Sequence, residues 1–535
     1  MKKVSIPFQQ VSQLSKTDIA YTTGDPLLSP FYAHQPTLKS FSGIIEERKG
    51  KNYPRKDLVE VLRGQYKPLV LKPVVNANIE ALIAENTFTI VTAHQPSLLF
   101  GPLYFIYKAL STVNLAKAVE KETGGVNRII PVYVIGAEDH DLEEVNHVKI
   151  FGKQLVWEPG KNGPVGSMQA SSTLPVLEEL KSMLGEKEGA KQLYDRILHT
   201  YLGKETFAEA TQALIHEFLG DTGLVVLNMN TPALKRHFAG ILQHELLEQD
   251  SSKIVNESIE KLNEVGFKTQ ATPREINVFY MKPGLRERII FENGQYKVLN
   301  TDLEFTQESI LQELEEHPEH FSPNVIMRPL YQEIILPNLA YVGGGGELAY
   351  WLERKTQFEH FGIPYPMLVR RHSVLWLDKD VVKKMEKLGL KEQDLFEETD
   401  ALIRNYLEKN TEGDLSLAEE IQALKNLYKQ IGSKAGAIDP TLETAVEAES
   451  VKAVSGFEHW ENRLLRAEKQ KHETAVNQIR NLKDRLFPEN GLQERVENII
   501  PLLLKYGDKF LLDLLDALEP LETEFIVLQP EPEEN

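Results

Sequence analysis

Short apolar runs alternate with amphipathic segments through the first two thirds of the chain. Residues 88–93 form a β-branched run of strand length, and residues 103–113 then place apolar side chains at helical spacing. Further strand-like runs are found at residues 129–135, 224–227, 339–342 and 367–369. Repeated strand–helix units are typical of a parallel sheet with helices on its faces, so the pattern predicts an α/β fold.

Helix starts are predicted after several of these strands. Asp141, with Glu144 three residues later, suits an N-cap, and this interpretation places His147 on the helix that follows. Residues 228–232 offer a cap and a proline for the first turn. A third helix is expected over residues 347–360, directly after a run of four glycines.

The later part of the chain has a different pattern. From residue 378 onwards charged, helix-forming sequence dominates, with an approximate 4/3 apolar repeat between Leu464 and Leu486 and a reversal at residues 432–440. This pattern predicts an antiparallel helical hairpin, whose apolar seam is more often an oligomer contact than a catalytic surface. We predict three domains. The first is a core at residues 1–377, with inserts at about 151–220 and 250–322, and the second is the helical hairpin at residues 378–490. In the third, residues 491–535, the chain returns to the core and ends in a disordered acidic tail.

Composition narrows the function classes. The chain has 535 residues and a formal net charge of −19, which disfavours nucleic acid as the main partner. It has no cysteine, and this excludes disulfides, a thiolate nucleophile, a zinc–thiolate site and an iron–sulfur cluster. Neither a signal peptide nor a membrane-spanning run is recognisable, so we expect a cytoplasmic protein without a membrane partner.

Polar residues follow the predicted strands where ligands bind in parallel sheets, beyond the carboxyl ends. His94 follows the first strand, and its imidazole can donate to a phosphate or simply bond a carbonyl in a turn. Glu138, Asp139 and His140 follow the second strand and could bind a cation, grip an ammonium group or deprotonate an amine. The alternative is that these groups are merely solvated, with Asp141 acting as a cap.

Two further segments suit anions. The glycines at residues 343–346 allow positive φ angles and close backbone approach, although Glu347 stands where a P-loop requires lysine, and a tight turn explains them equally well. Arg328, Arg370 and Arg371 offer positive charge, and one of the last two could simply face solvent. The segment His244–Glu248 has only the first half of a zincin motif, so we expect a solvated helix face there.

Taken together, these motifs resemble the BshC family of bacillithiol biosynthesis, over essentially the whole chain. The resemblance rests on five features: residues 92–96 with 100–102, residues 136–141, residues 322–324 with 328–329, residues 341–344 with 347 and 350–351, and the helical hairpin. It implies a Rossmann-like core with connecting-peptide inserts, similar to class I aminoacyl-tRNA synthetases. It also implies a coiled-coil domain that makes a homodimer.

The resemblance further implies a ligase that adds L-cysteine to the amine of glucosaminyl-malate. ATP with Mg²⁺ and a cysteinyl-adenylate are implied only by analogy with the mycothiol ligase, because His94–Pro96 and Arg371–Ser373 do not reproduce the synthetase signatures. The hypothesis gives catalytic roles to His94, Asp139, His140 and Arg328. Roles in binding substrate or nucleotide are given to Thr92, Gln95, Gly101, Glu138, Asn324, Gly343, Gly344, Glu347, Arg371 and Ser373.

Two other functions stay open at this point. An ATP-independent cysteinyl transferase would use the same residues without a nucleotide. A non-catalytic dimeric scaffold would use the hairpin as its working surface. No metal ligand is assigned, and any metal would have to bind His, Asp or Glu, with Asp139 and His140 the first candidates.

Overall fold

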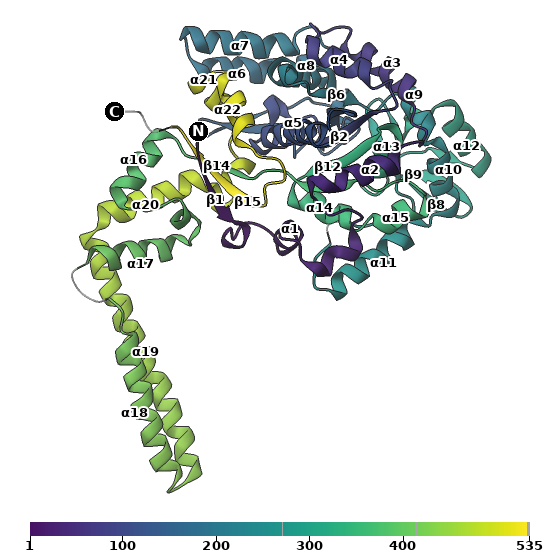
Figure 1. Cartoon of the computed structure of the whole chain (residues 1–535). Helices are drawn as coiled ribbons and strands as arrows, with labels where there is room; N and C mark the ends of the chain where they lie inside the picture. The colour runs from purple at the N-terminus through teal and green to yellow at the C-terminus, as the bar shows by residue number, and fades with distance from the viewer. Residues whose placement is uncertain (270, 412–414, 532–535) are drawn as a thin grey trace. The chain divides into compact units, whose positions relative to one another are not determined.

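A computed structural model describes residues 1–269, 271–411 and 415–531, which fold into two compact units (Figure 1). Unit 1 contains residues 1–375 and 492–528, and unit 2 contains residues 376–491 together with the segment that starts at 529. The chain therefore leaves the first unit, builds the second, and returns. Of the acidic tail, residues 532–535 lie outside the described part of the chain.

The centre of unit 1 is a five-stranded parallel sheet in the order β13-β12-β2-β3-β6. Its strands are β2 (Thr87–His94), β3 (Arg128–Ile135), β6 (Val225–Asn228), β12 (Asn338–Gly343) and β13 (Met367–Arg370). All five predicted strands are present. The chain builds outwards from β2 to β6 and then restarts on the other side of β2 with β12, which is the Rossmann order with its switch point between β2 and β12.

The sheet is buried on both faces, which explains why its strands are continuous apolar runs. Phe88 and Ile90 of β2 pack with Leu115 and Val119 of helix α5 (Tyr104–Glu122) in a core that also takes residues from β3, β12 and β13. Two capping predictions are confirmed around β6, where Thr231 caps α9 and Pro232 occupies its first turn.

Further elements surround this sheet in unit 1. The N-terminal helices are α1 (Lys16–Thr22), α2 (Phe41–Arg48), α3 (Arg55–Tyr66) and α4 (Pro73–Ala81). Between β3 and β12 lie α6 (Leu174–Leu184), α7 (Glu188–Tyr201), α8 (Phe207–Leu219), α9 (Pro232–Lys235), α10 (Ala239–Glu248), α11 (Ser251–Glu264), α12 (Gln307–Glu316) and α13 (Arg328–Ile335). After β12 come α14 (Gly345–Leu352) and α15 (Lys355–His360), and the returning chain adds α21 (Ile500–Tyr506) and α22 (Lys509–Ala517).

Three smaller sheets complete unit 1. The second predicted insert carries an antiparallel sheet in the order β10-β9-β8-β7-β11. Its strands are β7 (Val278–Lys282), β8 (Leu285–Glu292), β9 (Gln295–Val298), β10 (Glu304–Phe305) and β11 (Phe321–Pro323). A hairpin is formed by β4 (His147–Ile150) and β5 (Lys153–Val156), and a three-stranded sheet by β1 (Lys2–Pro7), β15 (Glu524–Gln529) and β14 (Val374–Trp376).

Several local predictions are wrong. His147 lies on strand β4, because the segment after Asp141 forms a turn with hydrogen bonds from Leu142 to His140 and from Val145 to Leu142. The helix expected over residues 347–360 is two helices, α14 and α15. None of the glycines at 343–346 has a positive φ. Close packing requires glycine at Gly345, since a Cβ there would overlap the side chain of Asp18, whereas a Cβ at Gly346 would meet no atom within 4 Å.

The face expected to be solvated at His244–Glu248 is also different. Glu245 is fully buried and accepts hydrogen bonds from the backbone and the side-chain amide of Asn277. His244 is part-exposed, and its Nε2 lies 3.1 Å from Asp250 Oδ2. The burial of Glu245 could not be predicted from the local pattern of charged and apolar residues, because its partner Asn277 lies outside helix α10.

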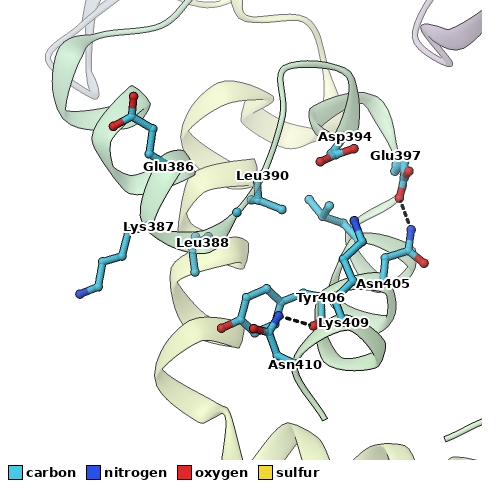
Figure 2. A pocket seen from close by; sticks show the side chains of 12 residues that line it. Glu386, Lys387, Leu388, Leu390, Asp394, Glu397, Asn405, Tyr406, Lys409 and Asn410 are labelled. Carbon is cyan, nitrogen blue, oxygen red and sulfur yellow. Dashed lines mark hydrogen bonds between the residues drawn. The ribbon is translucent and has the colours of Figure 1, made fainter. Parts of the chain in front are cut away.

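Unit 2 is helical, as predicted. It contains α16 (Lys379–Leu388), α17 (Thr399–Asn410), α18 (Ala418–Gly436), α19 (Pro440–Lys471) and α20 (Glu473–Leu486). Helices α18 and α19 run antiparallel side by side as a long hairpin (Figure 1). A cavity of about 390 Å³ lies beside α16 and α17 with walls made only of unit 2, and it contains none of the predicted site residues (Figure 2). Among the described residues, no helix is both long and apolar enough to cross a bilayer.

Candidate functional site

The carboxyl edge of the parallel sheet brings the main candidate residues together. The register aligns His94 at the end of β2 with Ile135 at the end of β3, and β12 ends beside β2 on the other side. His94 at the end of β2, Asp139 after β3 and Glu347 in the first turn of α14 after β12 therefore lie at the same edge of the sheet. In open α/β sheets the crevice that binds a ligand is found at such a switch point, here between β2 and β12.

A buried ion pair lies at the switch point. Glu347 Oε1 accepts hydrogen bonds from Lys108 Nζ (2.6 Å) and Tyr341 Oη (2.7 Å), and its Oε2 accepts one from the Gly344 N–H (2.9 Å). The Lys108 side chain is fully buried, whereas a quarter of the Glu347 side chain is exposed. Sequence reasoning missed Lys108, although a lone lysine in an otherwise apolar helical stretch was a usable signal.

The two partners stay ionised at neutral pH. Burial lowers the pKa of Lys108 to about 8, and the charge of Glu347 opposes a larger fall. Burial works against ionisation of Glu347 as well, yet Lys108 and His94 bring its pKa down to about 2. The ammonium group thus supplies a fixed positive charge at the crevice.

His94 is neutral at the same place. Burial, followed by the charge of Lys108, lowers the pKa of His94 to about 4. Its Nδ1 lies 3.1 Å from the Gln95 N–H and 3.3 Å from the Gln95 carbonyl oxygen, and its Nε2 lies 2.9 Å from Tyr104 Oη. Both ring nitrogens therefore have partners within the chain, and His94 brings no positive charge to the site at neutral pH.

Arg328 is a second cation close to Glu347. It begins helix α13 and hydrogen-bonds to Tyr350. Burial works against its charge, but Tyr350, Tyr341 and Glu347 hold its pKa above the ordinary value. Two cations thus surround one carboxylate, which leaves a local excess of positive charge. We call Lys108, Arg328, Glu347 and His94 the cationic cluster.

The loop after β3 carries a second group with the opposite character. Gln95 Nε2 donates to Asp139 Oδ2 (2.8 Å) and to Glu144 Oε2 (3.0 Å), so one amide holds two carboxylates close together. Arg286 Nη1 lies 3.7 Å from Asp139 Oδ1. Although burial opposes ionisation, Arg286 and the Gln95 amide lower the pKa of Asp139. We call Gln95, Asp139, Glu144, His140 and Arg286 the carboxylate cluster.

Arg286 also fixes the protonation of His140. Its Nη1 donates to His140 Nδ1 at 2.6 Å, while burial and the charge of Arg286 lower the pKa of His140. A neutral imidazole whose Nδ1 accepts a hydrogen bond carries its proton on Nε2. The free nitrogen is then a donor, so the structure does not support the predicted role of His140 as a base.

Glu138 lies behind this cluster. Its Oε2 accepts a hydrogen bond from Ser322 Oγ (2.7 Å), and its Oε1 lies 2.5 Å from Nζ of the fully buried Lys235. Ser322 Oγ in turn accepts a hydrogen bond from Arg286 Nε (3.0 Å). Glu138 therefore orients Arg286 through Ser322. Sequence reasoning missed Arg286 and Lys235, which come from β8 and α9 and carry no motif.

Three other predicted residues have partners inside the fold. Thr92 is buried and donates to the Val342 carbonyl across the sheet. Asn324 bonds Asn277 and accepts from the N–H groups that begin the α13 turn. Gly101, at φ 68° and ψ −152°, ends a turn in which Leu99 and Phe100 also have positive φ, and only glycine adopts that last conformation readily. The Gly101 carbonyl accepts from Asn498 (2.7 Å).

Arg371 and Ser373 are also internal. Arg371 donates to both oxygens of Glu494 at 3.1 and 2.8 Å, and Ser373 Oγ donates to the same carboxylate. Arg370 makes an equivalent pair with Asp18. Neither arginine faces solvent, so both expected positive charges are neutralised by carboxylates of this chain. Gly343 and Gly344 lie at the crevice, where a Cβ on Gly344 would be 3.5 Å from Arg371.

Comparison with known proteins covers nearly all of the chain. Residues 1–372 match the family model "Bacillithiol biosynthesis BshC, N-terminal Rossmann-like domain", and residues 374–530 match "Bacillithiol biosynthesis BshC, C-terminal coiled-coil domain". These matches confirm the predicted fold class. A solved structure titled as a putative arginyl-tRNA synthetase from Campylobacter jejuni aligns at 11% identity over 81% of this chain and 94% of that one, with a TM-score of only 0.21.

Three relatives illustrate the range of similarity, all named "Putative cysteine ligase BshC". The protein from Flavobacterium johnsoniae is 40% identical over 98% of this chain and 99% of its own length. The one from Christiangramia forsetii is 39% identical over 98% of both chains, and the one from Bacillus cytotoxicus is 27% identical over 95% and 96%. Since both family models match and these relatives align end to end, the chain belongs to the BshC family of bacillithiol biosynthesis proteins.

Proposed function

We propose that this protein is a ligase that joins the carboxyl group of L-cysteine to the free amine of glucosaminyl-malate, driven by ATP. The observation that carries the proposal is the pairing of the two clusters at one sheet edge. A free amino acid presents an ammonium group next to a carboxylate, and activating that carboxylate requires a polyphosphate close by. The carboxylate and cationic clusters meet these opposite requirements.

Asp139 and Glu144 suit the ammonium group of cysteine. A carboxylate whose pKa is lowered stays ionised and holds a proton poorly, which favours binding of a cation over general base catalysis. Gln95 fixes both carboxylates. The role proposed for Asp139 is therefore recognition, and the amine of the second substrate would lose its proton to solvent or to the departing phosphate.

Lys108, Arg328 and the first turn of α14 suit the phosphate groups. The cations are fixed by burial and by Glu347, so they need little reorganisation as negative charge shifts to the leaving group. In the proposed reaction a cysteine carboxylate oxygen displaces pyrophosphate from ATP. The glucosamine nitrogen then forms the amide bond, AMP leaves, and one proton is released. Mg²⁺ would enter with the triphosphate as its counter-ion.

The proposal includes a homodimer through the hairpin. Leu427, Val451 and Trp460 are more than half exposed on α18 and α19, and Ile431, Ile438 and Leu442 are exposed on the same hairpin. An exposed apolar row along a long hairpin is typical of a surface that is covered in an assembly. Sedimentation of the full chain, compared with a Val451→Glu/Trp460→Glu variant, tests this part.

The experiment that tests the activity is incubation of the purified protein with L-cysteine and glucosaminyl-malate, with and without ATP and Mg²⁺, followed by mass spectrometry. Amide product only with ATP supports the ligase. Product without ATP would contradict the energy source and favour a cysteinyl transferase. No product in either case, from protein that is folded and dimeric, would contradict the enzyme proposal and favour a scaffold.

A further inference from the structure

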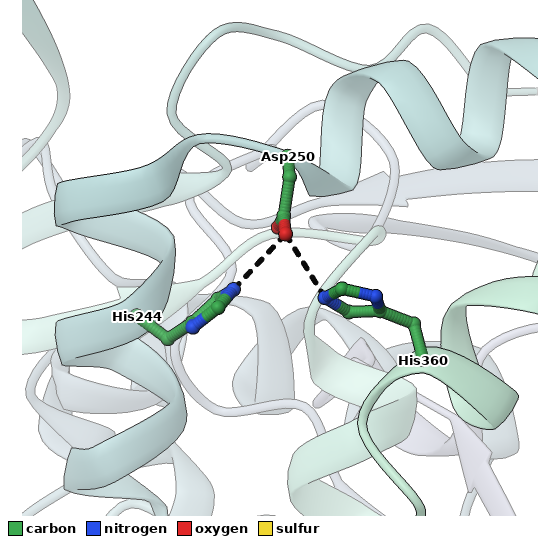
Figure 3. Close-up of side chains that lie close together, drawn as sticks. All are labelled: His244, Asp250 and His360. Carbon is green, nitrogen blue, oxygen red and sulfur yellow. Dashed lines mark hydrogen bonds and ion pairs between the residues drawn. The ribbon is translucent and has the colours of Figure 1, made fainter.

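A second group of polar side chains shares no residue with the two clusters of the candidate site. His244 in the middle of α10, Asp250 before α11 and His360 at the end of α15 place three ligand atoms within 4.8 Å of one another. Figure 3 shows both imidazoles directed at the same carboxylate. His244 Nε2 lies 3.1 Å and His360 Nε2 lies 2.9 Å from Asp250 Oδ2.

We propose that His244, Asp250 and His360 form a binding site for a divalent first-row transition-metal ion, with Zn²⁺ the best match. Two imidazoles and one carboxylate form a donor set used by zinc and iron, whereas Mg²⁺ and Ca²⁺ prefer oxygen ligands only.

The geometry is close to what such an ion requires. With bonds of 2.0–2.1 Å, neighbouring ligand atoms of a tetrahedral zinc site are about 3.3 Å apart. The two measured N···O separations, 3.1 and 2.9 Å, are only a few tenths of an ångström shorter. Small rotations of the side chains would therefore open the centre of the triangle, with a fourth position left for water.

The second observation is an unsatisfied carboxylate oxygen. Asp250 Oδ1 is buried and, within the described part of the chain, has no hydrogen-bond partner. An aspartate in this position ordinarily caps the following helix, but Asp250 makes no side-chain bond to the N-terminus of α11. Its side chain is turned to the histidines instead, and bidentate binding of an ion would satisfy both oxygens.

The imidazoles are held in place by packing. Phe361 contacts His244 edge-on at 5.3 Å and His360 edge-on at 4.9 Å, measured between ring centroids. The other group with metal-ligand spacing, His317, Glu319 and His320, is different because His320 Nδ1 is already 2.7 Å from Glu313. That group serves as the matched control.

The test uses the full chain with any affinity tag removed, stripped by a chelator and then equilibrated with Zn²⁺ or Co²⁺. We expect one equivalent of zinc per chain, and a visible cobalt spectrum of low-coordinate nitrogen and oxygen ligation. In Asp250→Asn and in His244→Gln, affinity should fall at least about tenfold. The control His317→Ala should bind as the parent does.

Each variant is first shown to be folded by circular dichroism in the presence of chelator. If Asp250→Asn does not fold, His244→Gln decides the outcome alone. Absence of zinc uptake at micromolar concentration by the parent would overturn the proposal and leave a hydrogen-bonded triad. Binding that survives His244→Gln, or that disappears in His317→Ala, would overturn it by placing the ion elsewhere. Neither readout depends on the proposed ligase activity.

Discussion

The Lys108–Glu347 pair and the Arg371–Glu494 pair lie at the same edge of the sheet, and each joins one basic side chain to one glutamate. Arg371 and Glu494 are 2% and 1% exposed, and the Glu494 oxygens also accept hydrogen bonds from Ser373 and from the Val374 N–H. Glu347 is 25% exposed, and the Lys108 ammonium is a point charge that guanidinium geometry does not lock. The first pair is therefore partly open on the Glu347 side, and the second is enclosed.

The two pairs differ in exposure rather than in charge. The Arg371–Glu494 pair is enclosed, and its hydrogen-bonding capacity is filled within the chain. Glu347 keeps an exposed side, whereas the Lys108 ammonium is fully buried and donates to Glu347 and to the Ala93 carbonyl, so we expect Lys108 to act on a ligand through its charge. Substitutions in the two pairs should therefore affect stability and activity differently.

Removing Arg371 should destabilise the protein most. Arg371→Ala leaves Glu494 buried without its counter-charge, and breaking such a pair costs about 3–5 kcal/mol of unfolding free energy. Denaturant unfolding measures the loss. The control is Arg63→Ala, which breaks the solvent-exposed pair with Glu80 and should have a much smaller effect on the unfolding free energy. Equal losses in the two variants would contradict the structural role of Arg371.

Removing Lys108 should affect activity more than stability. In Lys108→Met the methylene stem is kept and Glu347 retains its bonds to Tyr341 and Gly344, so the stability loss should be about 1–2 kcal/mol. Amide formation should fall about 100- to 1000-fold, as expected for a lost donor to developing charge. Product formation by mass spectrometry provides the measurement. Near-normal turnover in a folded Lys108→Met would show that this pair is structural too.

Stability should fall in acid through buried histidines. Burial lowers the pKa of His372 to about 4, below the ordinary value of 6.5. The unfolded chain therefore takes up the proton first, and stability is lost as the pH falls from about 6.5 to about 4, by up to about 3 kcal/mol. His94 acts in the same direction. A His372→Gln variant should show a shallower fall in unfolding free energy over this range, and an unchanged slope would refute the assignment.

Thr92 should have the smallest effect. Thr92→Val keeps the shape of the side chain and removes the hydrogen bond to the Val342 carbonyl, which is worth about 1 kcal/mol. Turnover should stay the same, because the hydroxyl lies inside the sheet. A tenfold fall in turnover without a loss of stability would return Thr92 to the binding site, where the sequence had placed it.

The sheet and the position of the site could be predicted because both follow from local pattern. Continuous apolar runs identified β2, β3, β6, β12 and β13, and the rule that ligands bind at the carboxyl ends placed His94, Asp139 and Glu347 at one edge. The hairpin followed from its repeat and its reversal. Strands β1 and β15 were missed because they pair with each other from opposite ends of the chain, although the apolar run Phe525–Leu528 in β15 was a usable signal.

The roles of individual residues could not be predicted in the same way. Whether Arg371 binds a ligand depends on Glu494, which is 123 residues further along the chain. The protonation of His140 depends on Arg286 from a different sheet. His147 was misplaced because a capping pattern is also compatible with a turn that leads into a hairpin. The roles of these residues depend on tertiary contacts, which cannot be derived from a single sequence.

The central claim is that the carboxylate cluster recognises the ammonium group of cysteine beside the cations that activate its carboxylate. The most direct measurement is calorimetric binding of L-cysteine and of 3-mercaptopropionate, which lacks the amine, to the parent protein and to Asp139→Asn. The parent should prefer L-cysteine, and Asp139→Asn should reduce that preference by about 10- to 100-fold, the equivalent of about 1.4–2.8 kcal/mol. An unchanged preference in a folded Asp139→Asn would contradict the claim.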